Sequence, residues 1–202
     1  YPYLRTHPLT TERIGEARAR MGPGAWRQAS QGRGQDSAIW AQHMLMAARA
    51  RVLMDTRSVS LQNLANPDIR RNATALQAVT AYYTAGVAQQ RGGDVARSLQ
   101  TFGLARQAAK ALPATQQGTV SRILALAVAD CQLASHQSIE AAATLNKELS
   151  DNKSVSHAAG RPEVLLAAHI ALSMSDGKTQ QFAWTDAASR LQTHVSNHPH
   201  DA

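Results

Sequence analysis

"AVTAYYTAGVAQQRGGDVARSLQTFGLARQAAKALP", residues 78–113, is the stretch that decides the fold. Apolar and small residues recur in it at helical spacing, Gly92 and Gly93 interrupt the pattern, and Pro113 closes it. Glycine pairs are typical of tight connections, and proline cannot continue a helix because its nitrogen carries no hydrogen. The stretch therefore predicts two helices, over residues 70–91 and 94–112, joined by the sequence RGGD into a hairpin.

This hairpin resembles the tetratricopeptide repeat (TPR), in which small residues let paired helices approach and large residues fill the groove between neighbouring hairpins. With Gly93 at the turn, the packing positions fall on Tyr82, Ala85, Gly86, Ser98, Phe102 and Ala105. A copy shifted by 43 residues falls on Ala125, Val128, Ala129, Ala141 and Leu145. Counting back from Pro199 as a closing proline places a third copy on Ala187 and Leu191.

The remaining helical periodicity is also organised in pairs. Helices are predicted over 36–56, over a short segment ending at 66–67, and over 118–134, 137–150, 162–175 and 179–197. Alanine dominates the apolar residues and only nine residues are aromatic, which suits closely packed helices. The sequence therefore predicts an all-α fold of stacked antiparallel helical hairpins, a TPR-like solenoid.

The predicted helix over 36–56 has its own apolar face. The face consists of Trp40, Met44, Ala47, Ala48 and Arg51. Three of the five methionines, at 44, 46 and 54, lie on this helix, and we expect them to fill gaps in its packing.

A curved stack of hairpins presents its first helices on an inner surface that can hold a segment of a partner. The candidate groove residues on this surface are Tyr83, Val87, Gln90, Asp130 and Leu133. The alternative for Tyr83 and Leu133 is that both are ordinary core residues.

The net charge of +7 is concentrated in the first part of the chain. Residues 1–60 hold nine Lys and Arg against four Asp and Glu, whereas residues 113–202 hold six against eight. A basic half suits nucleic acid, an anionic membrane surface or an acidic partner. Few aromatic residues accompany the arginines, so we expect no nucleic-acid binding. No apolar run is long enough for a transmembrane segment.

The sequence offers no complete catalytic or metal site. No histidine belongs to an HExxH sequence, and His43 and His169 lack a second ligand one helical turn away. His194, His198 and His200 are closely spaced, but a proline at 199 breaks their shared helical face. The single cysteine, Cys131, lies in the apolar stretch ALAVADCQLA and is predicted to be a buried, inert thiol. We therefore expect that this chain itself binds no metal and no cofactor.

The segment LRTHPLTTERI, residues 4–14, resembles the sequence that follows the catalytic domain in bacterial periplasmic zinc metallopeptidases with the HExxH sequence. The general form in that family is S/T-H-P, four variable residues, then R-I. Thr6, His7, Pro8, Arg13 and Ile14 match it in identity and spacing. A Gly/Pro-rich linker and a TPR tail follow in that family, which is the order predicted here.

The resemblance implies a periplasmic parent enzyme whose zinc is held by a catalytic domain outside this chain. His7 would lie near that zinc and could occupy its open position, and Arg13 would anchor the helix against the catalytic domain. The implied domains are a junction helix over 1–21, a Gly-rich linker over 22–36 and a TPR-like repeat domain over 37–202. The tail would bind outer-membrane assembly machinery or misfolded client proteins for the protease. The alternative is a stand-alone TPR adaptor with no protease attached.

Overall fold

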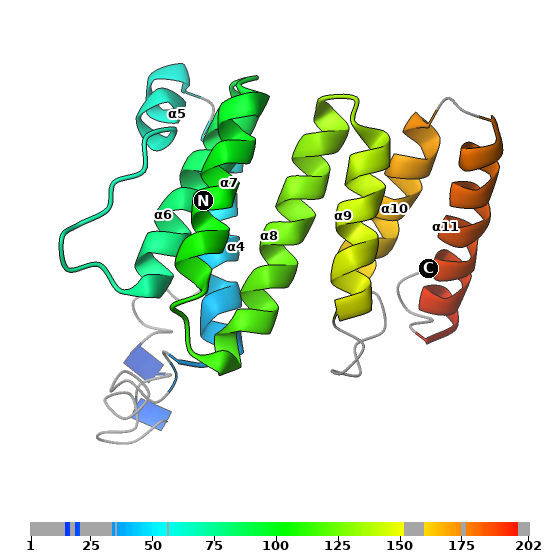
Figure 1. Ribbon diagram of the computed structural model, residues 1–202. Helices are drawn as coiled ribbons and strands as arrows, with labels where there is room; N and C mark the ends of the chain where they lie inside the picture. The colour runs from blue at the N-terminus through cyan, green and yellow to red at the C-terminus, as the bar shows by residue number, and fades with distance from the viewer. Residues whose placement is uncertain are drawn as a thin grey trace, which may run out of the picture.

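The computed structural model describes the chain over residues 36–55, 57–151, 160–174 and 177–197, together with Gly15, Glu16, Ala19, Arg20 and Gly34. Eight helices follow one another from residue 38 onward in these ranges (Figure 1). They are α4 (Ala38–Met54), α5 (Ser58–Leu64), α6 (Ala75–Arg91), α7 (Val95–Ala109), α8 (Ala114–Ala134), α9 (Ser138–Asp151), α10 (Arg161–Ser173) and α11 (Gly177–Asn197). The described part of the chain contains no strand, so the all-α prediction is confirmed.

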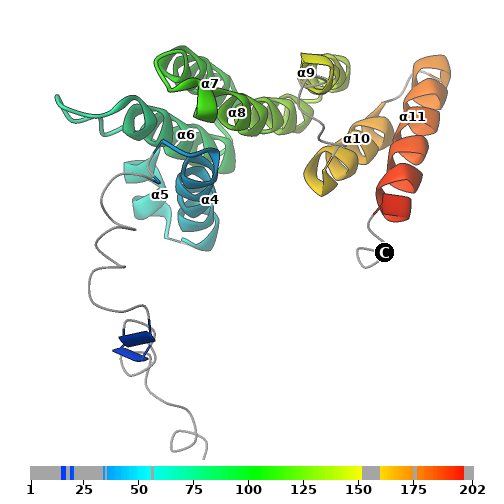
Figure 2. The same ribbon diagram turned by 90° about the horizontal axis from the view of Figure 1, so that it is seen from below.

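The helices pack as consecutive hairpins in a solenoid-like row. The pairs are α6 with α7, α8 with α9, and α10 with α11, and the hairpins meet where α7 contacts α8 and α9 contacts α10 (Figure 1). Helix α4 breaks the simple order, because it packs across both α6 and α8. Figure 2 shows α4 and α10 on one side of α8, with α7 and α9 on the other.

Two helices begin four or five residues away from their predicted starts. Helix α6 starts at Ala75 instead of residue 70, because Thr74 and Gln77 form a reciprocal capping box that satisfies backbone amides at this end. Helix α8 starts at Ala114, four residues before the predicted start, directly after Pro113 at the N-cap. The turn between α6 and α7 is as predicted, with Gly93 at a φ of 84° that suits glycine.

Helices α6 and α7 pack against each other at Gly86 and Phe102. Phe102 is fully buried and its ring centroid lies 6.0 Å from that of Tyr83. Ser98 donates a hydrogen bond from its hydroxyl to the Gly86 carbonyl oxygen at 2.8 Å, which draws the two helices together. Of the packing positions predicted in the three copies, all are buried except Tyr82 and Leu191, which are partly buried.

The buried face of α4 differs from the predicted one. It consists of Ala41, Leu45, Ala48 and Val52. The predicted face is therefore wrong except for Ala48, which is buried, and Met44, which is partly buried, because α4 is rotated so that its aliphatic stripe meets α6 and α8. Trp40 and His43 are exposed and stack on each other, with ring centroids 5.8 Å apart.

Two of the three methionines on α4 do not fill the core. Met54 is 82% exposed and Met46 is 40% exposed, so the expectation of packing is wrong for both. Only Met44 packs against the core cluster, and it is partly buried.

Both ends of α4 are fastened to helices of the hairpins. Arg91, at the end of α6, donates from Nη1 to the carbonyl oxygens of Val52 and Leu53 in the last turn of α4. Thr115, at the start of α8, donates its hydroxyl to the carbonyl oxygen of Asp36 just before α4. Helix α4 is thus part of the folded body, and its apolar stripe belongs to the same core as α6, α7 and α8.

The predicted junction helix over 1–21 and linker over 22–36 lie outside the described residues, apart from the five single positions given above and Asp36. No described helix combines the length and apolarity that a membrane span requires.

Candidate functional site

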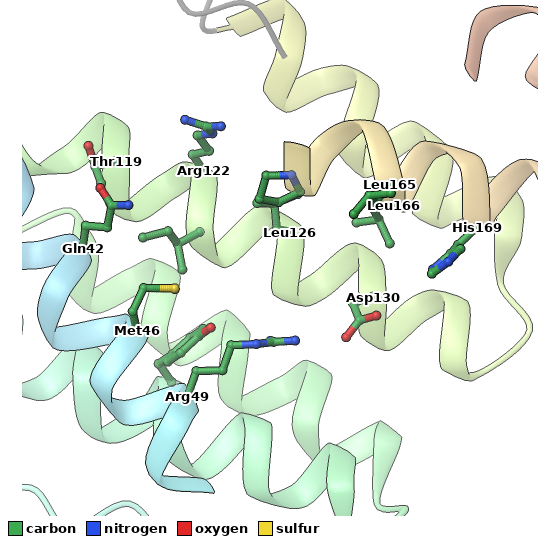
Figure 3. A pocket seen from close by; sticks show the side chains of 13 residues that line it. Gln42, Met46, Arg49, Thr119, Arg122, Leu126, Asp130, Leu165, Leu166 and His169 are labelled. Carbon is green, nitrogen blue, oxygen red and sulfur yellow. The ribbon is translucent and has the colours of Figure 1, made fainter. Parts of the chain in front are cut away.

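A pocket of about 490 Å³ lies between α4 and α10, with α8 as its floor (Figure 3). We call it the α8 trough and define it by Met46 and Arg49 from α4, Leu126 and Asp130 from α8, and Leu165 and His169 from α10. It follows from the position of α4, because α4 and α10 form two walls on the same side of α8. Its volume lies in the range of pockets that hold small molecules or peptide segments.

The centre of the trough is apolar. Met46 and Leu165 face each other across α8 from the two walls and are 40% and 45% exposed, respectively, while Leu126 is partly buried between them. Such half-exposed side chains gain about 1 kcal/mol each when a partner covers them, since full burial of a Leu or Met contributes ~1.5–3 kcal/mol. Contacts at several such positions are needed for micromolar binding, which requires about 8 kcal/mol.

One end of the trough is polar, and contacts between helices hold its side chains in place. The carboxylate of Asp130 accepts a hydrogen bond from Nε2 of Gln90 at 3.1 Å, which ties α6 to α8. Arg49 hydrogen-bonds to the side chain of Tyr83, which is almost fully buried. Burial raises the pKa of Tyr83 above its ordinary value, and Arg49 partly opposes that rise, so Tyr83 is neutral.

The other end is held by an ion pair between α8 and α10. Nε of Arg122 contacts Oε1 of Glu163, whose carboxylate is buried in the first turn of α10. A carboxylate is favoured there by the positive end of the helix dipole. Oε2 of Glu163 has no hydrogen-bond partner among the described residues. A Cβ at Gly160 would stand 2.6 Å from Nη2 of Arg122, so a side chain at this position would displace the guanidinium.

The structure brings together three of the five predicted groove residues. Tyr83 and Asp130 line the α8 trough, and Gln90 contacts Asp130. Val87 is buried in the core formed by α4, α6, α7 and α8, and Leu133 packs partly buried against the second core of α8, α9 and α10. They lie outside the trough, Val87 because α4 covers the inner face of α6.

Sequence reasoning missed the two walls of the trough. Met46, Arg49, Leu165 and His169 come from helices whose placement beside α8 is a tertiary effect. A signal was present in RPEVLLAAHIAL, where Leu165 adds an apolar residue beyond the buried stripe of Val164, Leu166 and Ile170.

The histidines and the cysteine do not form a reactive group in the described residues. His43 and His169 are both exposed, and His169 lines the α8 trough. Cys131 is fully buried as predicted, and its Sγ lies 3.4 Å from Oγ of Ser98. Burial raises the pKa of the Cys131 thiol, which disfavours the reactive thiolate.

The described residues contain no group of three or more His, Cys, Asp or Glu side chains that could hold a metal ion. Thr6, His7, Pro8, Arg13 and Ile14 lie outside the described residues, as do His198 and His200. Comparison of the chain with protein-family models, curated proteins and solved structures found no match.

Proposed function

We propose that this chain is the protein-binding tail of a periplasmic zinc metallopeptidase, similar to the beta-barrel assembly-enhancing protease, and that the α8 trough holds segments of its client proteins. The observation that carries the proposal is the trough itself, an open apolar centre between two polar ends on a stack of helical hairpins. The sequence match at residues 4–14 is the basis for the metallopeptidase and for the periplasm.

The trough suits an extended or helical segment with an apolar residue in its middle. Met46, Leu126 and Leu165 would cover the apolar side chain, and Arg49 and Asp130 at one end of the trough and Arg122 at the other would meet polar groups on either side. Unfolded outer-membrane proteins alternate apolar and polar residues along each strand, so many of their segments meet this requirement. Each client segment would bind weakly, and the trough would select the pattern of apolar and polar residues instead of one exact sequence.

Zinc belongs to the parent enzyme in this proposal. The described residues do not fit a catalytic zinc, because such a site needs three protein ligands and none of the described side chains form that group. His7 would act on the metal of the catalytic domain. The chain therefore contributes binding and positioning of the client.

The test compares two leucines of equal exposure. Leu165 in the trough and Leu104 on α7 are both 45% exposed, and only Leu165 lines the trough. We expect Leu165→Glu to weaken binding of a urea-diluted outer-membrane barrel protein at least tenfold, because a carboxylate is placed in the apolar centre. Leu104→Glu should leave the affinity within twofold. Equal loss in both variants would reject the trough as the binding site.

The stand-alone adaptor shares the trough and differs only in what precedes it. The discriminating observation is the coding sequence upstream of residue 1. An HExxH sequence there supports the metallopeptidase, and an unrelated or absent domain supports the adaptor.

A further inference from the structure

A second concave site lies on the opposite side of α8 from the trough. It is a cleft of about 640 Å³ lined by α7, α8 and α9. We call it the basic cleft and define it by Arg106 and Lys110 from the end of α7, Gln117 from α8, and Thr144 and Lys147 from α9. Figure 2 shows α7 and α9 together on the side of α8 that faces away from α4 and α10.

The charge of this cleft is uncompensated within the described residues. Its lining includes three cations and no carboxylate, and none of the three forms an ion pair with a described residue. Arg106 and Lys110 are four residues apart, which places them side by side on one helical face. Lys147 comes from the partner helix of the next hairpin, so the positive charge is spread along the cleft and not gathered at one point.

We propose that the basic cleft binds an acidic peptide segment, one that presents several Asp or Glu side chains along its length. All three cations are exposed, and single exposed ion pairs contribute little, so useful affinity requires several carboxylates at once. The volume exceeds what one compact anion needs, and it is sufficient for a peptide segment.

The end of α7 favours a ligand whose carboxylates are spread along a chain and disfavours a single phosphate group. The last carbonyl groups of a helix carry partial negative charge. Gln117 lines the cleft, and its Nε2 donates to the carbonyl oxygen of Lys110, the C-cap of α7, at 3.5 Å and to that of Leu112 just beyond at 2.8 Å, so carbonyl groups at this end of α7 lie at the edge of the cleft. The cations alone account for anion binding in the cleft, without backbone N–H groups from the start of a helix. A peptide, unlike a compact phosphate group, can place its carboxylates beside the cations and away from the carbonyl oxygens.

The basic cleft and the α8 trough can be occupied at the same time, because α8 separates them. Binding at the basic cleft does not depend on the metallopeptidase assignment, since it uses only the cations and shape of the cleft. An acidic segment bound there would recruit a second partner, or a second region of the same partner, to the outer face of the hairpins.

The test uses the full chain and a fluorescein-labelled hexaglutamate peptide at low ionic strength, with binding followed by anisotropy. The cleft variant carries Arg106→Gln, Lys110→Gln and Lys147→Gln. The control variant carries Arg51→Gln, Arg70→Gln and Arg71→Gln, three exposed arginines outside the cleft. Both variants lose three positive charges. We expect the cleft variant to lose about tenfold in affinity and the control variant less than twofold, with both retaining the helical circular dichroism of the parent.

Three outcomes would overturn the proposal. Equal losses in the cleft and control variants would mean that the peptide responds only to net charge. Displacement of the peptide by pyrophosphate or by a DNA duplex, at a lower concentration of negative charge than unlabelled hexaglutamate requires, would assign the cleft to phosphate. A DNA affinity that falls only in the cleft variant would assign the cleft to nucleic acid.

Discussion

The ring of Phe102 occupies the space where a side chain on Gly86 would begin. A Cβ placed on Gly86 would stand 2.5 Å from Cε1 of Phe102 and within 3 Å of two more ring atoms. Helices α6 and α7 therefore approach closely because residue 86 has no side chain, and the buried Ser98 hydroxyl adds a hydrogen bond at the same place.

Gly86→Ala should destabilise the protein by about 1–3 kcal/mol, because the added methyl group forces the Phe102 ring or the whole of α7 to move. The free energy of unfolding in urea measures this effect. Gly103→Ala is the matched control, since Gly103 lies within α7 and nothing is within 4 Å of its Cβ position. That control should be neutral or stabilising by up to about 1 kcal/mol. An unchanged free energy of unfolding in Gly86→Ala would contradict the close approach of α6 and α7 at this position.

Arg91→Gln should loosen α4 without unfolding the hairpins. The guanidinium of Arg91 satisfies two carbonyl groups at the end of α4 and also favours the negative end of its dipole, so its loss costs about 1 kcal/mol. Amide hydrogen exchange should become faster in α4 than in α6. Arg71→Gln, an exposed arginine, serves as the control. Faster exchange across every helix would contradict a local role for Arg91.

Glu163→Gln should weaken the junction between α8 and α10. The substitution keeps the shape of the side chain but removes the negative charge that contacts Arg122, and we expect a loss of about 1–2 kcal/mol. This is less than for a fully buried pair because Arg122 is partly exposed to solvent. The comparison is Asp186→Asn, which breaks the pair with Arg190 on α11 and should cost about 0.5 kcal/mol or less. Equal losses of stability in the two variants would mean that burial of Glu163 does not make its ion pair with Arg122 more important than the exposed pair.

Cys131 should resist thiol reagents until the protein opens. The thiol is fully buried and burial raises its pKa, so both access and thiolate formation are disfavoured in the native state. Ellman's reagent should react slowly in buffer and at least roughly 100-fold faster in denaturing urea. Gln107→Cys provides an exposed thiol on the same protein as a positive control. Rapid native reaction at Cys131 would contradict the packing of α8 against α7.

The hairpins were predictable from sequence because their signals are local. Gly93, Pro113 and the spacing of small and large residues determine where helices turn and which faces meet. The capping box at Thr74 was present as well, and it explains why α6 begins later than periodicity alone suggested.

The position of α4 could not be predicted in the same way. Its stripe of Ala41, Leu45, Ala48 and Val52 lies about a quarter turn around the helix from the predicted face, and both faces contain apolar residues. The choice depends on the shape of α6 and α8, which is a tertiary property. One wall of the candidate site follows from that placement: Tyr83 and Asp130 were predicted from the sequence, but Met46 and Arg49 on α4 were not.

The most direct test of the central claim is photo-crosslinking from inside the α8 trough. A photoreactive amino acid replaces Leu165 in one sample and Leu104 in another, and each is illuminated with an outer-membrane barrel protein diluted from urea. We expect an adduct with the barrel protein from position 165, and little or none from position 104. Adducts of equal yield at both positions, or an adduct only at position 104, would contradict the central claim.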